Sequence, residues 1–202
     1  MFSGVELVIF DMDQTLVDSK LCYKSLHELI LDKFAVCTKN GILEAIEGMD
    51  LPEREAAMND VENWELGGLE NACMVNNAIY VLEELFTRGI KLGLFTRNNE
   101  KVMCRAMELF DIQKFFDSWA SRDYGQEVKP HPQHILHIMD NLDVDPKKTV
   151  VVGDWTFDVE CGKRAGALTV GFQRHENYPA EFFEHCDHVI RDLTELVSLI
   201  EN

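Results

Sequence analysis

The chain has 202 residues, of which 46% are hydrophobic and 27% are charged, a balance typical of a globular protein. Acidic residues outnumber basic residues by 36 to 19, and the formal net charge is -17. A surface this acidic repels phosphate backbones and anionic lipids, so we expect neither a nucleic acid nor a membrane as a partner.

Targeting and membrane signals are absent from the sequence. The N-terminal apolar run is short and follows no Lys or Arg, and no apolar run approaches the roughly 18 residues of a membrane span. The cysteines are dispersed and form no CxxC pair, so we expect free thiols in the core of a cytoplasmic protein. These six residues are Cys22, Cys37, Cys73, Cys104, Cys161 and Cys186.

The first predicted element is a strand at 5–10, an apolar run that fits burial on both faces of a parallel sheet. It ends in two carboxylates, Asp11 and Asp13, separated by one residue. The segment 18–74 follows with helical patterns and no strand signal, and Gly67-Gly68 interrupts its last helix. We therefore expect a small all-helical insertion.

Strand and helix signals alternate after the insertion. We expect helices at 75–88, 100–110 and 132–142, a short helix ending at 166 and another from 193, and strands at 90–95, 115–121, 149–152, 167–172 and 187–190. This alternation predicts an α/β fold with a doubly wound, mainly parallel sheet. The core domain would comprise 1–17 and 75–202, and 18–74 would form a separate subdomain.

Polar side chains stand at the predicted strand ends or in the loops after them, where open α/β sheets bind their ligands. They are Asp11, Asp13, Thr96, Lys129, Asp154 and Asp158. Carboxylates brought together repel unless a cation lies among them. Four carboxylates, a hydroxyl and an ammonium, with no His or Cys in the set, suit Mg²⁺ and phosphoryl chemistry.

Structural roles are the alternative for several of these residues. The two N-terminal carboxylates can mark a solvated turn, Thr96 or Asp158 can cap a helix N-terminus, and Lys129 can lie on a surface loop. His131, His134 and His137 also cluster, but they lack Cys or carboxylate partners at ligand spacing, so zinc is not expected.

Taken in order, Asp11-x-Asp13-x-Thr15, Thr96, Lys129 and Gly153-Asp154-x-x-x-Asp158 resemble the four motifs of the haloacid dehalogenase superfamily of phosphohydrolases. The resemblance implies a Rossmann-like core with an α-helical cap formed by 18–74. Such a cap is similar to that of the subfamily that includes phosphoglycolate phosphatase and β-phosphoglucomutase.

This resemblance implies a role for each acidic residue. Asp11 would attack phosphorus and form an aspartyl-phosphate, and Asp13 would act as general acid and base. Asp11, Asp154 and the backbone carbonyl of Asp13 would bind Mg²⁺ directly, and Asp158 would bind it through water.

The substrate's phosphoryl group would be held by Thr96 and Lys129, with Arg97 and Asn98 beside them. Two positions depart from the family pattern: Gln14 stands where Gly is usual, and Trp155 is larger than the residue expected there.

The expected activity is Mg²⁺-dependent hydrolysis of a small phosphorylated metabolite by a phosphoglycolate phosphatase-like monomer or homodimer. A phosphomutase of the same fold and a non-catalytic Mg²⁺- or phosphate-binding scaffold are the alternatives, whereas Asp13 argues against the dehalogenase and phosphonatase branches. Substrate selection is assigned to basic and aromatic side chains, namely Lys20, Tyr23, Lys24, Arg54 and Arg97.

Overall fold

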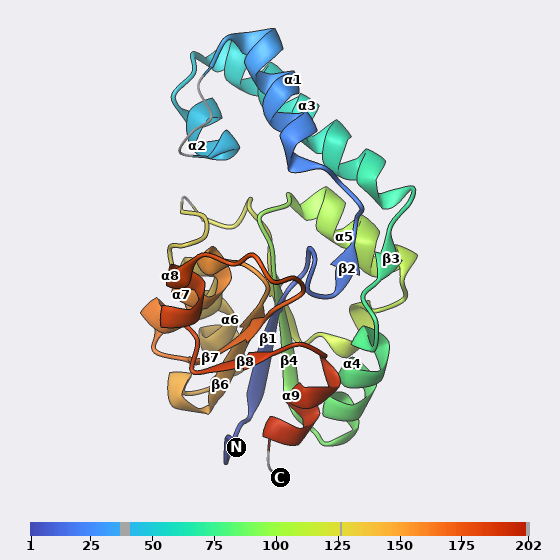
Figure 1. Cartoon of the computed structure of the whole chain (residues 1–202), viewed down its shortest axis with the longest axis vertical. Coiled ribbons are helices and arrows are strands. Elements are labelled where there is room, and N and C mark those ends of the chain that lie inside the picture. The colour runs from blue at the N-terminus through green and yellow to red at the C-terminus, as the bar shows by residue number, and fades with distance from the viewer. Residues whose placement is uncertain (37–40, 126, 201–202) are drawn as a thin grey trace. The chain divides into compact units, whose positions relative to one another are not determined.

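The computed structural model describes residues 1–36, 41–125 and 127–200. The chain divides into two compact units, one formed by Met1–Asp18 with Cys73–Asn202 and the other by Ser19–Ala72 (Figure 1). The boundaries between the units therefore follow residues 18 and 72. The sequence pattern predicts them after residues 17 and 74.

The larger unit is built on a six-stranded sheet in the order β5-β4-β1-β6-β7-β8. Every neighbouring pair in this sheet is parallel. Its strands are β1 (Leu7–Asp11), β4 (Lys91–Phe95), β5 (Ser118–Ala120), β6 (Thr149–Gly153), β7 (Leu168–Phe172) and β8 (His188–Ile190). The predicted α/β fold class is confirmed.

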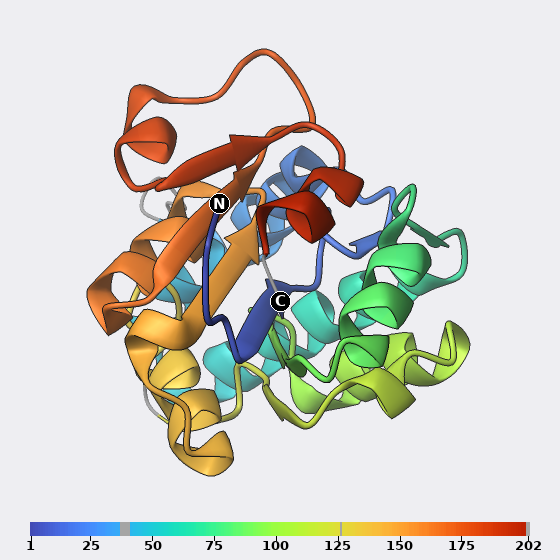
Figure 2. The same ribbon diagram turned by 90° about the horizontal axis from the view of Figure 1, so that it is seen from below.

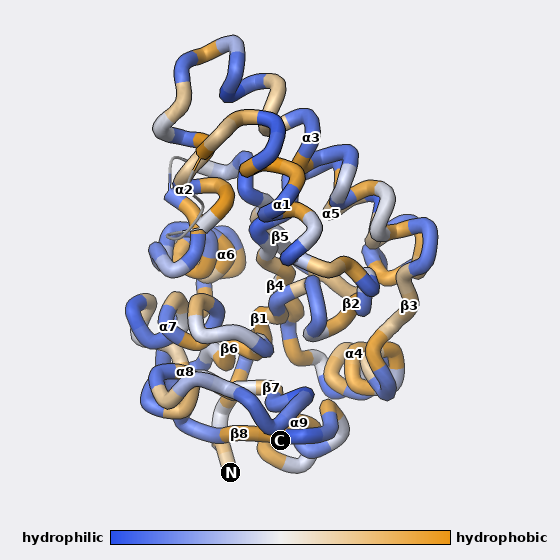
Figure 3. The backbone as a smooth tube through the Cα atoms, turned by 45° about the horizontal axis from the view of Figure 1, so that its top comes forward, coloured by the Kyte–Doolittle hydropathy of each residue, from blue (hydrophilic) through white to orange (hydrophobic). Residues whose placement is uncertain are grey.

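Strand β1 lies at the centre of the sheet, and all five of its residues are buried. It pairs with β4 from Leu7 opposite Lys91 to Asp11 opposite Phe95, so the two strands end level with each other. Gly93 lets a helix approach β4 closely, because a Cβ there would lie 2.8 Å from Cγ2 of Ile138. The apolar character of the central strands is visible in Figure 3.

Helices cover both faces of the sheet, with α6 and α7 on one side and α4 and α5 on the other (Figure 2). The helices of this unit are α4 (Ala78–Thr87), α5 (Glu100–Leu109), α6 (Gln133–Leu142), α7 (Thr156–Ala165), α8 (Ala180–Glu184) and α9 (Thr194–Leu199). Short 3₁₀ turns at Gln113–Phe115 and Pro146–Lys148 lead into β5 and β6. The sequence pattern did not predict α8, which is only five residues long.

The smaller unit consists of α1 (Tyr23–Phe34), α2 (Ile42–Glu47) and α3 (Leu51–Leu69). Apolar side chains from all three helices form its core, namely Leu26, Ile30, Ile42, Leu43, Ile46, Ala57 and Val61. The predicted helix break at Gly67-Gly68 is wrong, because α3 continues through both residues. Gly68 instead makes room for Leu21, whose Cδ1 would lie 2.5 Å from a Cβ at this position.

A two-stranded ribbon was not predicted. Strands β2 (Val17–Asp18) and β3 (Cys73–Met74) pair antiparallel at the point where the chain leaves and re-enters the larger unit. Two residues per strand are too few to produce an alternating pattern that a sequence can reveal.

The expectation of core thiols holds only in part. Cys161 is buried and Cys186 is half-buried, but Cys22, Cys73 and Cys104 are exposed. All five are free, and Cys37 lies outside the described residues. Among the helices of the described ranges, none has the length and apolar content needed to cross a membrane.

Candidate active site

The carboxyl ends of neighbouring strands bring the predicted site residues together. Asp11 is the last residue of β1, Thr96 follows β4, and Asp154 follows β6. Since β4, β1 and β6 are adjacent and parallel, these residues share one edge of the sheet.

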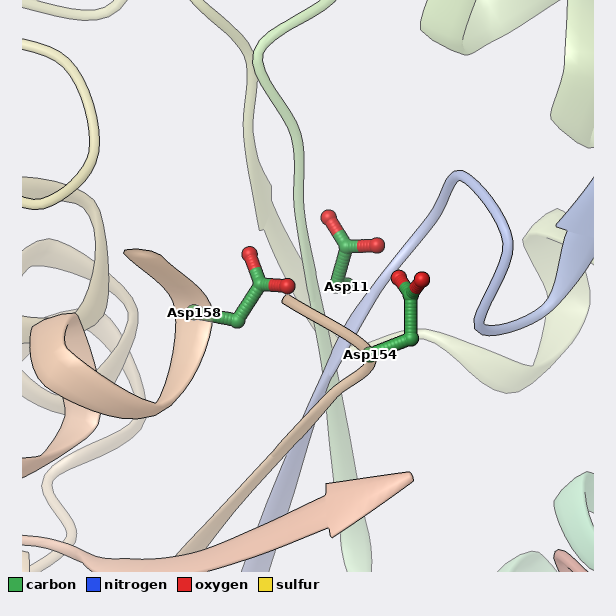
Figure 4. A group of neighbouring side chains, drawn as sticks. All are labelled: Asp11, Asp154 and Asp158. Carbon is green, nitrogen blue, oxygen red and sulfur yellow. The ribbon is translucent and has the colours of Figure 1, made fainter. Parts of the chain in front are cut away.

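Three carboxylates converge at this edge. Ligand oxygens of Asp11, Asp154 and Asp158 all lie within 4.8 Å of one another. Figure 4 shows the three side chains reaching toward a common centre from the end of β1, the loop after β6 and the first turn of α7. Asp11 and Asp158 are buried, and Asp154 is half-buried.

Lys129 is the buried cation of the site, with only 2% of its side chain exposed. Its ammonium contacts the carboxylate of Asp11 and donates to Oδ1 of Asp158 at 2.9 Å. Burial alone would lower the pKa of Lys129, but the charges of Asp11 and Asp158 raise it well above the usual value. Lys129 therefore keeps its charge and bridges two of the three carboxylates.

One ammonium does not neutralise this cluster. Burial, and then repulsion by Asp158, raises the pKa of Asp11 well above its usual value despite the attraction of Lys129. The same two causes raise the pKa of Asp154 to about 8. Oxygen donors with surplus negative charge in a buried setting fit a hard divalent cation, so this cluster can bind a metal ion.

Asp13 lies beside the cluster and has different partners. Its Oδ2 accepts a hydrogen bond from Nδ2 of Asn98 at 2.7 Å and contacts Oγ1 of Thr96 at 3.4 Å. Burial raises the pKa of Asp13 to about 6, against the lowering effect of Lys129 and of these hydrogen bonds. A carboxyl group with such a pKa can give and take a proton near neutral pH.

Thr96 is fully buried and does not cap the following helix. Asn99 is the N-cap of α5, and its side chain accepts from the backbone N–H of Val102 at 2.9 Å. The Thr96 hydroxyl instead accepts from the backbone N–H of Asn98 at 3.1 Å. The alternative of Thr96 as a helix cap is therefore wrong.

Asp158 combines the site contact with a capping contact. Its Oδ1 faces Lys129, while Oδ2 accepts from the backbone N–H of Trp155 at the start of α7, at 3.0 Å. Gly153 is required beside it, because a Cβ there would lie 2.2 Å from Cβ of Asp158. Trp155 is exposed, with 47% of the residue accessible to solvent.

The remaining predicted residues lie next to Thr96. Asn98 points its amide at Asp13, and the guanidinium of Arg97 lies over the ring of Phe157, 5.5 Å from its centroid. The backbone carbonyl of Arg97 accepts from Arg122 at 2.9 Å.

Two contacts of the site were missed from the sequence. Thr15, the last residue of the Asp11-x-Asp13-x-Thr15 motif, donates to Oδ1 of Asp154 at 3.3 Å. Arg174 bonds both Gln14 and Asp18. Arg174 follows β7 by two residues, so the rule that selected Thr96 and Asp154 at strand ends also applies to it.

The histidine cluster is packed without a metal-type ligand set among the described residues. Buried His134 donates through Nε2 to the carbonyl of Tyr124, at 3.1 Å, and its Nδ1 has no hydrogen-bond partner among the residues that the structure describes. Burial, aided by the charge of Lys129, lowers the pKa of His134 to about 4.

Acid is expected to destabilise the protein through His134. Between pH 6.5 and 4 the unfolded chain binds a proton here that the folded chain does not, so stability falls as pH falls. From pH 7 to 4.5 the loss is about 2–3 kcal/mol of unfolding free energy, measurable by urea denaturation. His134→Gln should remove this loss and exposed His131→Gln should retain it, whereas equal pH slopes for wild type and His134→Gln would contradict the assignment.

Comparison with known proteins agrees with this site. Residues 8–172 match the family model described as haloacid dehalogenase-like hydrolase. The chain belongs to this family of hydrolases, which confirms the predicted family and enzyme class.

Particular relatives share most of the chain's length. Pyrophosphatase PpaX of Oceanobacillus iheyensis is 24% identical, over 98% of this chain and 97% of the relative. Phosphoglycolate phosphatase of Aquifex aeolicus is 28% identical, over 82% of this chain and 83% of the relative. The crystal structure of a predicted phosphoglycolate phosphatase from Haemophilus somnus has the same fold, with a TM-score of 0.78, 20% identity and coverage of 97% and 98%.

Proposed function

We propose that this protein is a Mg²⁺-dependent phosphatase that hydrolyses a small phosphorylated metabolite through an aspartyl-phosphate on Asp11. The observation that carries the proposal is the placement of Asp11 beside a second carboxyl group, Asp13, and a buried lysine at the ligand edge of the sheet. The names of the phosphatase and pyrophosphatase relatives support the same reaction class.

The Mg²⁺ ion is assigned to Asp11, Asp154 and Asp158, with the backbone carbonyl of Asp13. Bound there, it would neutralise the negative charge that otherwise keeps an anionic nucleophile from an anionic phosphate. Both carboxylate oxygens of Asp158 already accept hydrogen bonds. This supports binding of the ion by Asp158 through water, and by Asp154 directly.

The reaction proceeds in two steps, formation of the aspartyl-phosphate and its hydrolysis. A carboxylate oxygen of Asp11 bonds to phosphorus as the bond to the leaving oxygen breaks, and Asp13 gives its proton to that oxygen. Asp13 then takes a proton from water, whose oxygen attacks phosphorus and releases phosphate from Asp11. Thr96 and Lys129 bind the phosphoryl oxygens in both steps.

Addition of Mg²⁺ is expected to stabilise the folded protein in the absence of substrate. Binding to the folded state alone raises the free energy of unfolding by about 2.7 kcal/mol at 100 times the Kd. Asp154→Asn should lose most of this gain, yet be no less stable than wild type in a chelator, because it removes a carboxyl group whose charged form burial disfavours. Thermal denaturation with and without Mg²⁺ measures both effects.

The control for the metal experiment is Asp140→Asn, which changes an exposed carboxylate on α6. This variant should respond to Mg²⁺ as the wild type does. An equal Mg²⁺ response of Asp154→Asn would contradict the assignment of the ion to this cluster.

The substrate class is tested by phosphate release from a panel of small phosphates. The panel holds phosphoglycolate, pyrophosphate, sugar phosphates and glycerol phosphate. Arg97, beside Thr96, is proposed to select substrates with a second anionic group, and we expect these to be hydrolysed preferentially. Uniform turnover of anionic and neutral substrates would contradict this selection.

The same panel separates the alternatives. Isomerisation of a sugar phosphate without net phosphate release would identify a phosphomutase, and binding without turnover would identify a scaffold. The assignment of 18–74 as a cap, with Lys20, Tyr23, Lys24 and Arg54 as selecting side chains, stays a prediction.

A further inference from the structure

The segment from Met12 to Asp18 forms a tight turn directly after β1. The backbone N–H groups of Leu16 and Val17 both donate to the carbonyl of Met12 at 2.9 Å, and that of Gln14 donates to the carbonyl of Val17 at 2.7 Å. Gln14 has φ 62°, in the left-handed region that is unfavourable for a residue with a side chain. Contacts of the Gln14 side chain add to these backbone hydrogen bonds in holding the conformation.

Arg174 bonds this turn from a distant part of the chain. Its Nη1 donates to Oε1 of Gln14, and its Nη2 donates to Oδ2 of Asp18 at 2.9 Å. Nε2 of Gln14 also donates to Oδ1 of Asp18 at 3.2 Å, which closes a ring of three side chains. We call Gln14, Asp18 and Arg174 the Arg174 clasp.

The clasp is partly shielded from water, since 25% of the Arg174 side chain and 11% of the Asp18 side chain are exposed. Arg174 stands 160 positions from Gln14 in the sequence, in the loop after β7, so the clasp ties the end of β1 to the end of β7. A guanidinium suits this task because its planar fork can meet two acceptors at once.

The turn that the clasp holds carries chemistry on its other side chains. Asp13 precedes Gln14 and reaches Asn98, and Thr15 follows it and reaches Asp154. The turn is thus fastened at Asp13 by Asn98, at Thr15 by Asp154, and at Gln14 by Arg174. Gln14 and Asp13 are joined by a single peptide unit, so the side chain that Arg174 contacts is next to the one that Asn98 contacts.

We propose that Arg174, acting through Gln14 and Asp18, is a positioning residue that fixes the carboxyl group of Asp13 for proton transfer. This inference rests on the proposed function, in which Asp13 protonates the leaving oxygen. Misplacement of that acid slows the departure of a poor leaving group, which needs the proton, more than the departure of a good one.

The kinetic test compares two substrates, an alkyl phosphate with a poor leaving group and p-nitrophenyl phosphate with a good one. The parameter is kcat/KM, because it covers the reaction up to departure of the leaving group and omits hydrolysis of the aspartyl-phosphate. Arg174→Met should lower kcat/KM by about 10-fold or more for the alkyl phosphate and by less than about 2-fold for p-nitrophenyl phosphate. Equal losses on both substrates would overturn the proposal.

Gln14→Gly provides a second variant in case Arg174→Met does not fold. It removes one of the two acceptors of Arg174 and leaves the other, Asp18, in place. Because glycine also relieves the unfavourable φ, a purely conformational role of Gln14 predicts wild-type activity or better. We expect instead the same selective loss on the alkyl phosphate. Wild-type kcat/KM on both substrates would refute the clasp.

The matched control is Arg105→Met, because Arg105 also pairs with a carboxylate, Glu108 at 2.8 Å, but lies exposed on α5. It should leave both kcat/KM values unchanged.

Hydrogen exchange tests the clasp independently of turnover. Deuterium uptake in peptides covering 12–18 should rise in Arg174→Met and stay at the wild-type level in Arg105→Met. Unchanged uptake in Arg174→Met would overturn the proposal even if the wild type hydrolysed no phosphate in the panel. Failure of the phosphatase assignment and failure of the clasp therefore give different results.

Discussion

Asp11→Asn is expected to abolish phosphate release, by at least about 10³-fold, because loss of a catalytic nucleophile has effects of this order or larger. An amide oxygen at this position is too weak a nucleophile to form the acyl-phosphate bond. Steady-state phosphate release from the best substrate of the panel measures the loss. Intact mass after acid quenching should show no phosphorylated protein.

The fold should survive this substitution. Burial and the neighbouring Asp158 make the charged form of Asp11 unfavourable, and Lys129 keeps its contact with Asp158 after the change. We therefore expect a melting temperature close to that of the wild type. Asp140→Asn serves as the control for activity, and substantial residual turnover by Asp11→Asn would contradict the covalent mechanism.

Asp13→Asn is expected to lower turnover by about 10²–10⁴-fold, the usual contribution of a general acid or base. Asparagine can still accept the hydrogen bond from Asn98, so its geometry is retained while its ability to transfer a proton is lost. The loss should be larger for alkyl phosphates than for p-nitrophenyl phosphate, whose leaving group needs no protonation.

Asp13→Asn should also trap the intermediate. With p-nitrophenyl phosphate the first step survives but no base activates water, so phosphorylated Asp11 accumulates and nitrophenol appears in a burst. Rapid mixing and acid-quenched mass spectrometry measure the burst and the modified residue. The double variant with Asp11→Asn should show neither, and undiminished steady turnover by Asp13→Asn would contradict its role.

Asn98 shows what a residue pattern can predict about the site and what it cannot. Its place after a strand was enough to include it in the site, and its amide does lie there, but it is bonded to Asp13. A sequence shows which side chains arrive at one sheet edge, because strand ends are local features. It does not show which of them bond to one another.

Gly68 and the short elements show a second limit. Glycine usually interrupts a helical pattern, yet α3 continues through Gly68. The side chain of Leu21 packs so closely here that the position has no room for a Cβ. Helix α8 and the ribbon of β2 and β3 span too few residues for a period to appear. In these places tertiary contacts outweigh local propensity.

The sequence alone predicts the α/β fold and the candidate site residues Asp11, Asp13, Thr96, Lys129 and Asp154, because buried parallel strands, and the polar residues at their ends or in the loops after them, leave a periodic and ordered pattern. The tertiary structure decides that Lys129 bridges Asp11 and Asp158, and that Arg174 joins Gln14 to Asp18. Those contacts join residues far apart in the chain, and their distances depend on strand order and side-chain packing, which no local pattern contains.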